Sequence, residues 1–145
     1  MSNIPPANAR RKILIVDDNP VVIKSLCLKL EAAGYQTVTA LDGSEAVAQV
    51  RKENPELILL DLNFPVDVTS VQWDGFRIIE WLRRLDAAKK IPIIVITGAE
   101  DVRTKERVLA SGAIALFIKP LEHDDLLKVI RTTLSDSEKQ PPAGL

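Results

Sequence analysis

ILIVDD, at residues 13–18, places two aspartates directly after a run of four apolar residues. Three further runs end with a single polar residue each: LILLD at 57–61, IIVIT at 93–97 and LFIK at 116–119. Short apolar runs separated by helical patterns are typical of parallel strands buried on both faces of a sheet. The carboxyl ends of such strands meet at one edge, where open α/β sheets bind their ligands. We therefore expect three acids, one hydroxyl and one cation to gather there, as in a phosphoryl-transfer site built around a divalent metal ion.

Around these runs, the chain alternates between strand and helix patterns five times. The predicted strands are 12–16, 36–40, 57–60, 91–96 and 115–118, and the predicted helices are 20–33, 43–53, 75–85, 102–110 and a last one ending near 134. Five such units with right-handed crossovers give an α/β fold with a doubly wound parallel sheet. We expect one domain over residues 11–134, between a lead at 1–10 and a tail at 135–145 that are polar, proline-bearing and disordered.

The composition narrows the class of protein. Hydrophobic residues make up 46% of the 145 residues and the net charge is −1, so a single globular core is expected and no basic field points to nucleic acid. The only cysteine, Cys27, excludes an internal disulfide and favours a reducing compartment. No run approaches the ~20 apolar residues of a membrane span. We therefore expect a cytoplasmic protein without a membrane or nucleic-acid partner.

Five motifs at the predicted strand ends resemble one known family, the response-regulator receiver domains of two-component signalling, such as the chemotaxis receivers. They are VDDN (16–19), LLDLNFP (59–65), WDGF (73–76), ITG (96–98) and IKP (118–120), and the similarity covers about residues 11–134. The resemblance implies a flavodoxin-like fold with five parallel strands in the order 2-1-3-4-5 and five flanking helices. It also implies that a sensor histidine kinase or a histidine phosphotransfer protein is the phosphodonor.

By the same resemblance, Asp61 is the candidate phosphoacceptor. A carboxylate is a weak nucleophile, so it must be held in line with the donor phosphorus while the developing charge is neutralised. The other interpretation of Asp61 is a capping or turn aspartate after a strand. The four other polar residues at the same predicted edge favour the functional interpretation.

Asp17, Asp18 and Asp61 are the candidate metal-binding side chains. Two unit charges about 4 Å apart repel by ~4 kcal/mol at an effective dielectric constant near 20, so three carboxylates at one edge need a cation. Mg²⁺ fits, because it takes oxygen ligands and is typically held by one or two carboxylates plus phosphate. In the family pattern, Asp18 and Asp61 bind directly, Asp17 binds through water, and the backbone carbonyl of Asn63 completes the protein ligands.

Thr97 and Lys119 complete the candidate catalytic set. In the family pattern, the ammonium of Lys119 pairs with Asp61 and then with the phosphoryl group, and Thr97 donates its hydroxyl to a phosphoryl oxygen. Taken alone, Thr97 is also an ordinary β-branched strand residue and Lys119 an ordinary surface lysine. His123, the only histidine, lies among acidic residues at the start of the last helix, and we expect it to be solvated and without a catalytic role.

The chain departs from the family pattern at two places. The family usually places an Asp-Gly pair seven and eight residues after the phosphoacceptor. Here Asp74 and Gly75 lie thirteen and fourteen residues after Asp61, so the chain has six more residues than the family pattern, and they fall within 66–73. This insertion, with Trp73, is either a lid or docking ledge or a loop packed on its own helix. Leu116 occupies the position where the family often carries an aromatic residue, and Phe117 cannot replace it because neighbouring strand residues face opposite sides.

The expected function is a receiver that accepts a phosphoryl group on Asp61 in a Mg²⁺-dependent step and then changes its affinity for a downstream protein. It is not expected to be an enzyme, beyond its own phosphorylation and slow dephosphorylation. Output is expected through the face of helix four, strand five and helix five, where a homodimer could also form. The alternatives are a receiver cut from a larger regulator or hybrid kinase, and an interaction module of this fold that is never phosphorylated. An aspartyl phosphohydrolase is disfavoured because position 19 is Asn, where that class carries a second Asp.

Overall fold

Five parallel strands form one sheet in the order β2-β1-β3-β4-β5. The computed structural model describes residues 11–61, 75–86, 88–98, 102–119 and 122–139. The strands are β1 (Lys12–Val16), β2 (Gln36–Ala40), β3 (Leu57–Asp61), β4 (Ile93–Thr97) and β5 (Ala115–Ile118). The predicted fold class and strand order are confirmed. β4 begins two residues later than predicted, after Pro92, which has no N–H to donate to a neighbouring strand.

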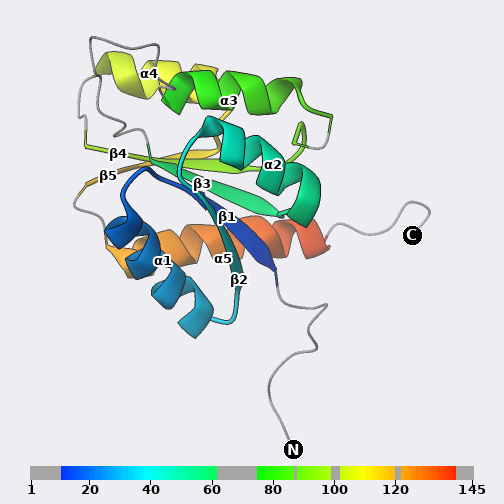
Figure 1. Cartoon of the computed structure of the whole chain (residues 1–145). Coiled ribbons are helices and arrows are strands. Elements are labelled where there is room, and N and C mark those ends of the chain that lie inside the picture. The colour runs from blue at the N-terminus through cyan, green and yellow to red at the C-terminus, as the bar shows by residue number, and fades with distance from the viewer. Residues whose placement is uncertain (1–10, 62–74, 87, 99–101, 120–121, 140–145) are drawn as a thin grey trace, which may run out of the picture.

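Five helices cover the two faces of the sheet (Figure 1). They are α1 (Pro20–Ala32), α2 (Gly43–Glu53), α3 (Gly75–Arg84), α4 (Val102–Ala110) and α5 (His123–Lys139). α1 and α5 lie on one face, and α2, α3 and α4 lie on the other (Figure 1). Each face has its own apolar core, because successive strand residues point to opposite sides.

The alternation along β5 decides the position of the residue pair at 116 and 117. Leu116 packs against the core beneath α2, α3 and α4. Phe117 packs against the core beneath α1 and α5. The two side chains therefore lie on opposite faces of the sheet, as the strand period requires, and Phe117 does not take the place of Leu116.

The first two helices begin at side-chain caps. The Asn19 side chain accepts a hydrogen bond from the Val21 N–H at 2.9 Å, and Pro20 follows in the first turn. Asp42 caps α2 by accepting from the Glu45 N–H at 2.8 Å. After α1, Gly34 adopts a φ of +99°, a left-handed conformation that L side chains rarely adopt.

The last helix corrects one predicted boundary. α5 continues to Lys139, so residues 135–139 belong to a helix and not to the disordered tail that was predicted. The polar composition of this segment does not by itself exclude a helix. The predicted lead at 1–10 and the residues from 140 onward lie outside the described residues. None of the described helices is long and apolar enough to span a membrane.

The amino ends of the strands are joined by ion pairs. The Arg11 guanidinium pairs with the Glu56 carboxylate and donates to the Leu134 carbonyl at 3.1 Å. Lys12 Nζ lies 3.0 Å from Glu53 Oε1. Both side chains are half-buried, and their ion pairs anchor the start of β1 to the neighbouring elements.

Candidate functional site

Four of the predicted site residues lie at the carboxyl edge of the sheet. Asp61 and Thr97 are the last residues of β3 and β4, and Asp17 and Lys119 directly follow β1 and β5. The backbone continues the sheet at both of the latter, since the Asp17 N–H donates to the Ala40 carbonyl at 3.1 Å and the Lys119 N–H to the Thr97 carbonyl at 2.8 Å. Asp17, Asp61 and Thr97 are buried, although they are polar. The strands thus fix the backbone positions from which these four side chains extend.

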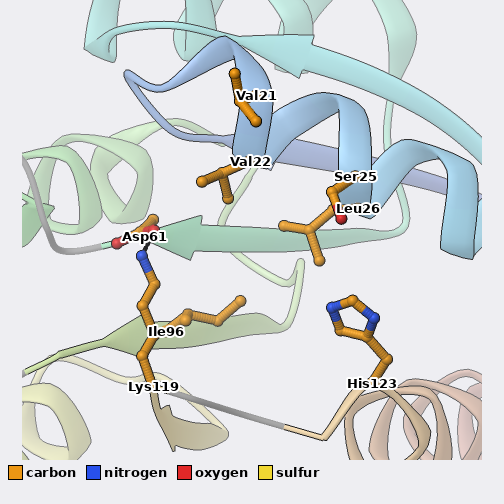
Figure 2. Close-up of a pocket in the computed structure, with 8 residues that line it drawn as sticks. All are labelled: Val21, Val22, Ser25, Leu26, Asp61, Ile96, Lys119 and His123. Carbon is orange, nitrogen blue, oxygen red and sulfur yellow. Dashed lines mark hydrogen bonds and ion pairs between the residues drawn. The ribbon is translucent and has the colours of Figure 1, made fainter.

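Lys119 and Asp61 form an ion pair across the edge. Lys119 Nζ lies 2.5 Å from Asp61 Oδ2, and the Asp61 side chain is 4% exposed (Figure 2). The Lys119 side chain is 31% exposed, so it is much more open to solvent than the Asp61 side chain. A charge-assisted bond of this kind is stronger than a neutral one and holds the carboxylate in a fixed orientation.

Asp17 lies beside this pair with half of its carboxylate unsatisfied. Its Oδ1 accepts from the Asn19 N–H at 2.9 Å, whereas its buried Oδ2 has no hydrogen-bond partner within the described part of the chain. Burial raises the pKa of Asp17 from 3.8 to about 7, and the neighbouring Asp61 adds to this rise. The Asn19 N–H and the Lys119 charge act in the opposite direction on the pKa but are outweighed. One lysine therefore does not neutralise two adjacent carboxylates.

The third predicted acid is not drawn into this group. Asp18 is exposed, and within the described ranges no three acidic, histidine or cysteine side chains are close enough together to hold a metal ion. The expected gathering of three carboxylates is therefore found only for Asp17 and Asp61. Asn63 lies outside the described residues, as does the inserted segment 66–73, so their roles stay predictions.

Thr97 is placed where the prediction requires. It is 2% exposed at the end of β4 and pairs in register with Ile118, next to Lys119. The exposed Gly98 follows it. Contact between the Thr97 hydroxyl and a phosphoryl group stays a prediction.

A pocket of about 570 Å³ opens beside the Asp61–Lys119 pair (Figure 2). It is lined by α1, by the ends of β3, β4 and β5, and by the first residue of α5: Val21, Val22, Ser25, Leu26, Asp61, Ile96, Lys119 and His123. The expectation that His123 is simply solvated is wrong, because the side chain is half-buried and lines the same pocket as Asp61. The sequence contains one indication that His123 lies near the site: it begins a helix only four residues after Lys119, and so it starts from the same carboxyl edge of the sheet.

Comparisons with known proteins bear on the family to which the chain belongs. The family model of the response regulator receiver domain matches residues 13–131. The DNA-binding dual master transcriptional regulator RpaA of Synechocystis sp. is 32% identical over 133 residues, which are 92% of this chain and 53% of RpaA. The polar-differentiation response regulator DivK of Brucella anthropi is 29% identical over 127 residues, which are 88% of this chain and 98% of DivK. The chain thus spans about half of the first relative and nearly all of the second.

Solved structures extend the same similarity. A CheY-like receiver domain protein from Methanospirillum hungatei has a TM-score of 0.79 at 28% identity, covering 92% of this chain and 100% of that one. The receiver domain of the sensor histidine kinase PA1611 from Pseudomonas aeruginosa has a TM-score of 0.73 at 27% identity, covering 86% of this chain and 97% of that one. That structure has a magnesium ion coordinated in its active-site cleft. Members of the matched family act in signalling and are not classical enzymes. The chain belongs to the response regulator receiver domain family.

Proposed function

We propose that this chain is a phosphoacceptor receiver that is phosphorylated on Asp61 in a Mg²⁺-dependent step and thereby switches its protein–protein interactions. The observation that carries the proposal is the buried Asp61 carboxylate, which is bonded to Lys119 Nζ at 2.5 Å and faces a pocket. An acceptor needs a fixed orientation, a nearby cation and room for the donor. Asp61 has all three.

Three residues of the chain would each have a separate role in phosphoryl transfer. An oxygen of Asp61 attacks phosphorus, the new P–O bond forms, and the bond to the donor's leaving group breaks. Lys119 reaches Asp61 from β5, so its ammonium is in place to pass from the carboxylate to a phosphoryl oxygen as charge shifts outward. Thr97, buried at the end of β4, would donate its hydroxyl to a second phosphoryl oxygen.

The residues present fit a magnesium ion in part. Asp17 Oδ2 is buried without a hydrogen-bond partner among the described residues, and a hard cation would satisfy it. Asp18 and Asp61 would bind the ion directly and Asp17 through a water molecule, with the Asn63 carbonyl as the remaining predicted ligand. When bound, Mg²⁺ neutralises negative charge that develops on the phosphoryl oxygens. The magnesium in the PA1611 receiver supports this assignment by similarity.

The proposed phosphodonor is a sensor histidine kinase or a histidine phosphotransfer protein, and the proposed output is a change in binding of a downstream protein. Two exposed apolar side chains, Leu109 of α4 and Ile114 just before β5, support an interaction surface at the α4–β5–α5 face. A homodimer through this face is one form that output could take. The proposed compartment is the cytoplasm, because a lone cysteine suits a reducing environment.

The test is to incubate the full chain with acetyl phosphate and Mg²⁺ and to follow its intact mass. We expect one phosphoryl group on the wild-type chain, none on Asp61→Asn, and strongly reduced labelling when Mg²⁺ is chelated. Asp86→Asn, which removes a 99% exposed carboxylate, is the matched control and should label like the wild type. If neither acetyl phosphate nor a phosphorylated histidine protein modifies Asp61, the chain is an interaction module of this fold and the proposal is wrong.

A further inference from the structure

The two edges of the sheet present exposed side chains of opposite charge. All strands are parallel and each helix follows a strand, so the helices begin at the carboxyl edge and end at the amino edge. Four exposed acids lie at the carboxyl edge, just before α1 and at the start of α5, and form what we call the acidic rim: Asp18, Glu122, Asp124 and Asp125. Four exposed bases lie at the amino edge, in the last turns of α3 and α4 and in the turn that leads to β4, and form the basic rim: Arg84, Lys89, Lys90 and Arg107. The surface is therefore polarised along the direction of the strands.

The stabilisation of helix ends does not account for the whole basic rim. Bases in the last turn of a helix interact favourably with its dipole, but Lys89 and Lys90 lie in the turn between α3 and β4, outside any helix. At the same edge, Arg11 and Lys12 are half-buried and are each paired with a glutamate. Lys90 has no ion pair within the described ranges, and the contact of Lys89 with Asp86, at 3.8 Å, joins two largely exposed side chains and contributes little. The two lysines of the turn are therefore available to a partner.

Arg83 holds the turn that carries these two lysines. Its guanidinium donates to three carbonyls of the turn, at 3.0 to 3.2 Å: those of Ala88, Lys89 and Ile91. The same guanidinium donates to the Gly112 carbonyl, between α4 and β5, at 3.1 Å. One side chain thus joins the two loops that carry or flank the basic rim. A partner that binds here would order side chains but not the loop backbone, which lowers the entropic cost of binding.

The acidic rim of another copy of the chain complements the basic rim. The acidic rim borders the pocket beside Asp61, because the pocket lining includes Val21 and His123, which are close in sequence to its members. Each edge also has an exposed apolar side chain that a contact would bury, since Val21 is 75% exposed at the carboxyl edge and Ile114 is 48% exposed at the amino edge. Opposite charges steer two surfaces together and set their orientation. The net charge of −1 gives two copies little overall repulsion.

The pattern of charge favours a protein partner over a nucleic acid or an anionic membrane. Three exposed acids lie on the same two helices and the same turn as the bases: Glu80, Asp86 and Glu106. An extended polyanion would bring its negative charge against these acids as well as against the bases. The carboxylates of a protein surface are separate from one another and can meet the bases alone.

From this complementarity, we propose that two copies of the chain associate weakly head to tail, with the basic rim of one copy on the acidic rim of the other. The contact covers the mouth of the pocket beside Asp61 in the copy that contributes its acidic rim, and so slows phosphorylation of that copy. The effect on phosphorylation rests on the proposed function, whereas the association itself does not. Exposed ion pairs are individually weak and are screened by salt, so we expect a dissociation constant on the order of 1 mM at low salt.

The experiment is sedimentation equilibrium of the full chain at protein concentrations up to about 1 mM, at low salt and at about 0.5 M NaCl. The average mass of the wild type should rise with concentration, and the higher salt should weaken the association about tenfold. Lys89→Glu/Lys90→Glu and Asp124→Lys/Asp125→Lys should each stay monomeric, because each variant loses the charge of one rim. An equal mixture of the two variants should associate, because the intact acidic rim of the first meets the intact basic rim of the second.

Lys29→Glu/Lys52→Glu is the matched control. These exposed lysines end α1 and α2 at the same amino edge but lie outside the basic rim, and their reversal changes the net charge by the same amount. The control should associate like the wild type. An equal loss of association in the control, a wild type that stays monomeric, or a mixture that does not associate would each overturn the inference. Far-UV circular dichroism verifies that the variants are folded, and the pair at 89–90 lies in a turn where no helix is disturbed.

Labelling with acetyl phosphate and Mg²⁺ tests whether the contact covers Asp61. The initial rate per molecule should fall as the concentration of the wild type rises, and it should stay constant for Lys89→Glu/Lys90→Glu. A constant rate in a wild type that associates would overturn the covering of the pocket. Failure of the wild type to be labelled at any concentration would instead contradict the proposed function, and sedimentation would still decide the association.

Discussion

The Lys119 ammonium lies 2.5 Å from the Asp61 carboxylate, and the carboxylate is by far the more buried partner, at 4% exposed against 31%. The cost of breaking the pair is therefore unequal. Removal of Lys119 leaves a buried charge without its cation, whereas removal of the Asp61 charge leaves a lysine that solvent can reach.

This inequality predicts the stability of three variants. Lys119→Met should lower the free energy of unfolding by about 1–3 kcal/mol, less than for a fully buried pair because the lysine is partly solvated. Asp61→Asn should cost less, and the double variant should recover part of the loss caused by Lys119→Met. Urea unfolding with Mg²⁺ chelated measures all four proteins. If the two single effects simply add, the ion pair contributes nothing in this setting.

The raised pKa of Asp17 predicts that the metal-free protein loses stability as the pH rises. Burial brings the pKa from 3.8 to about 7 in the folded state, so between these values the folded protein holds a proton that the unfolded chain has lost. The stabilisation is complete below about pH 4 and is lost as the pH passes through about 7. The expected loss is on the order of 2–4 kcal/mol.

The measurement is urea unfolding in a chelator at a series of pH values across this window. Asp17→Asn should lack the decline and should be more stable than the wild type near neutral pH. Asp86→Asn, at an exposed position, should follow the wild-type curve and thus controls for the loss of one acidic residue. A wild-type curve that is flat or rises across the window would contradict the prediction.

Magnesium should reverse the loss of stability that accompanies ionisation of the Asp17 carboxylate. A bound cation satisfies the Asp17 Oδ2 atom and replaces the proton, so added Mg²⁺ should raise the melting temperature of the wild type and do so more strongly as the pH rises past 7. Asp17→Asn and Asp61→Asn should each weaken the effect. Thermal melts with Mg²⁺, or with the chelator alone, check this. Equal shifts in wild type and Asp17→Asn would place the ion elsewhere.

A pair of glycines offers a matched test of packing at the opposite edge of the sheet. Gly34 and Gly112 have nearly equal φ angles, +99° and +100°, but a Cβ at Gly34 meets nothing within 4 Å. A Cβ at Gly112 would lie 3.3 Å from Arg83 Nε. Arg83 cannot easily move aside, because its guanidinium donates to four carbonyls, those of Ala88, Lys89, Ile91 and Gly112.

Gly34→Ala should therefore show only the backbone cost of a left-handed alanine, about 1–2 kcal/mol. Gly112→Ala should cost more, through the displaced guanidinium. In an Arg83→Ala background, the additional destabilisation of Gly112→Ala over Gly34→Ala should vanish. Arg83→Ala is itself destabilising, because it leaves carbonyl groups without their hydrogen-bond donor. Denaturant unfolding of the four variants gives the coupling. Equal costs at the two glycines would show that Arg83 yields without strain.

The sequence predicted the features that are determined by neighbouring residues better than those that depend on distant parts of the chain. Asp61, Thr97 and Lys119 were placed correctly because each is fixed to the end of an apolar strand, and strand ends in a parallel sheet coincide. Asp18 lies one residue beyond Asp17 and is exposed, and its role as a metal ligand stays a prediction.

His123 shows a different limit. Its neighbours in sequence, Glu122, Asp124 and Asp125, are all exposed, and local composition therefore indicated a solvated helix start. Its side chain lines a pocket together with residues of α1, which lies about a hundred residues earlier in the chain and on the same face of the sheet as α5 (Figure 1). Contacts between elements so far apart in the sequence are determined by the topology of the fold, and a local sequence pattern does not predict them.

The Arg11 bonds to Glu56 and to the Leu134 carbonyl have a practical consequence for studying the protein in cells. They bring the start of β1 and the later turns of α5 to the sheet edge remote from Asp61. A variant such as Glu56→Gln, which breaks one of these bonds, should therefore lower the stability of the protein in cells without touching the Asp61–Lys119 pair at the other edge of the sheet.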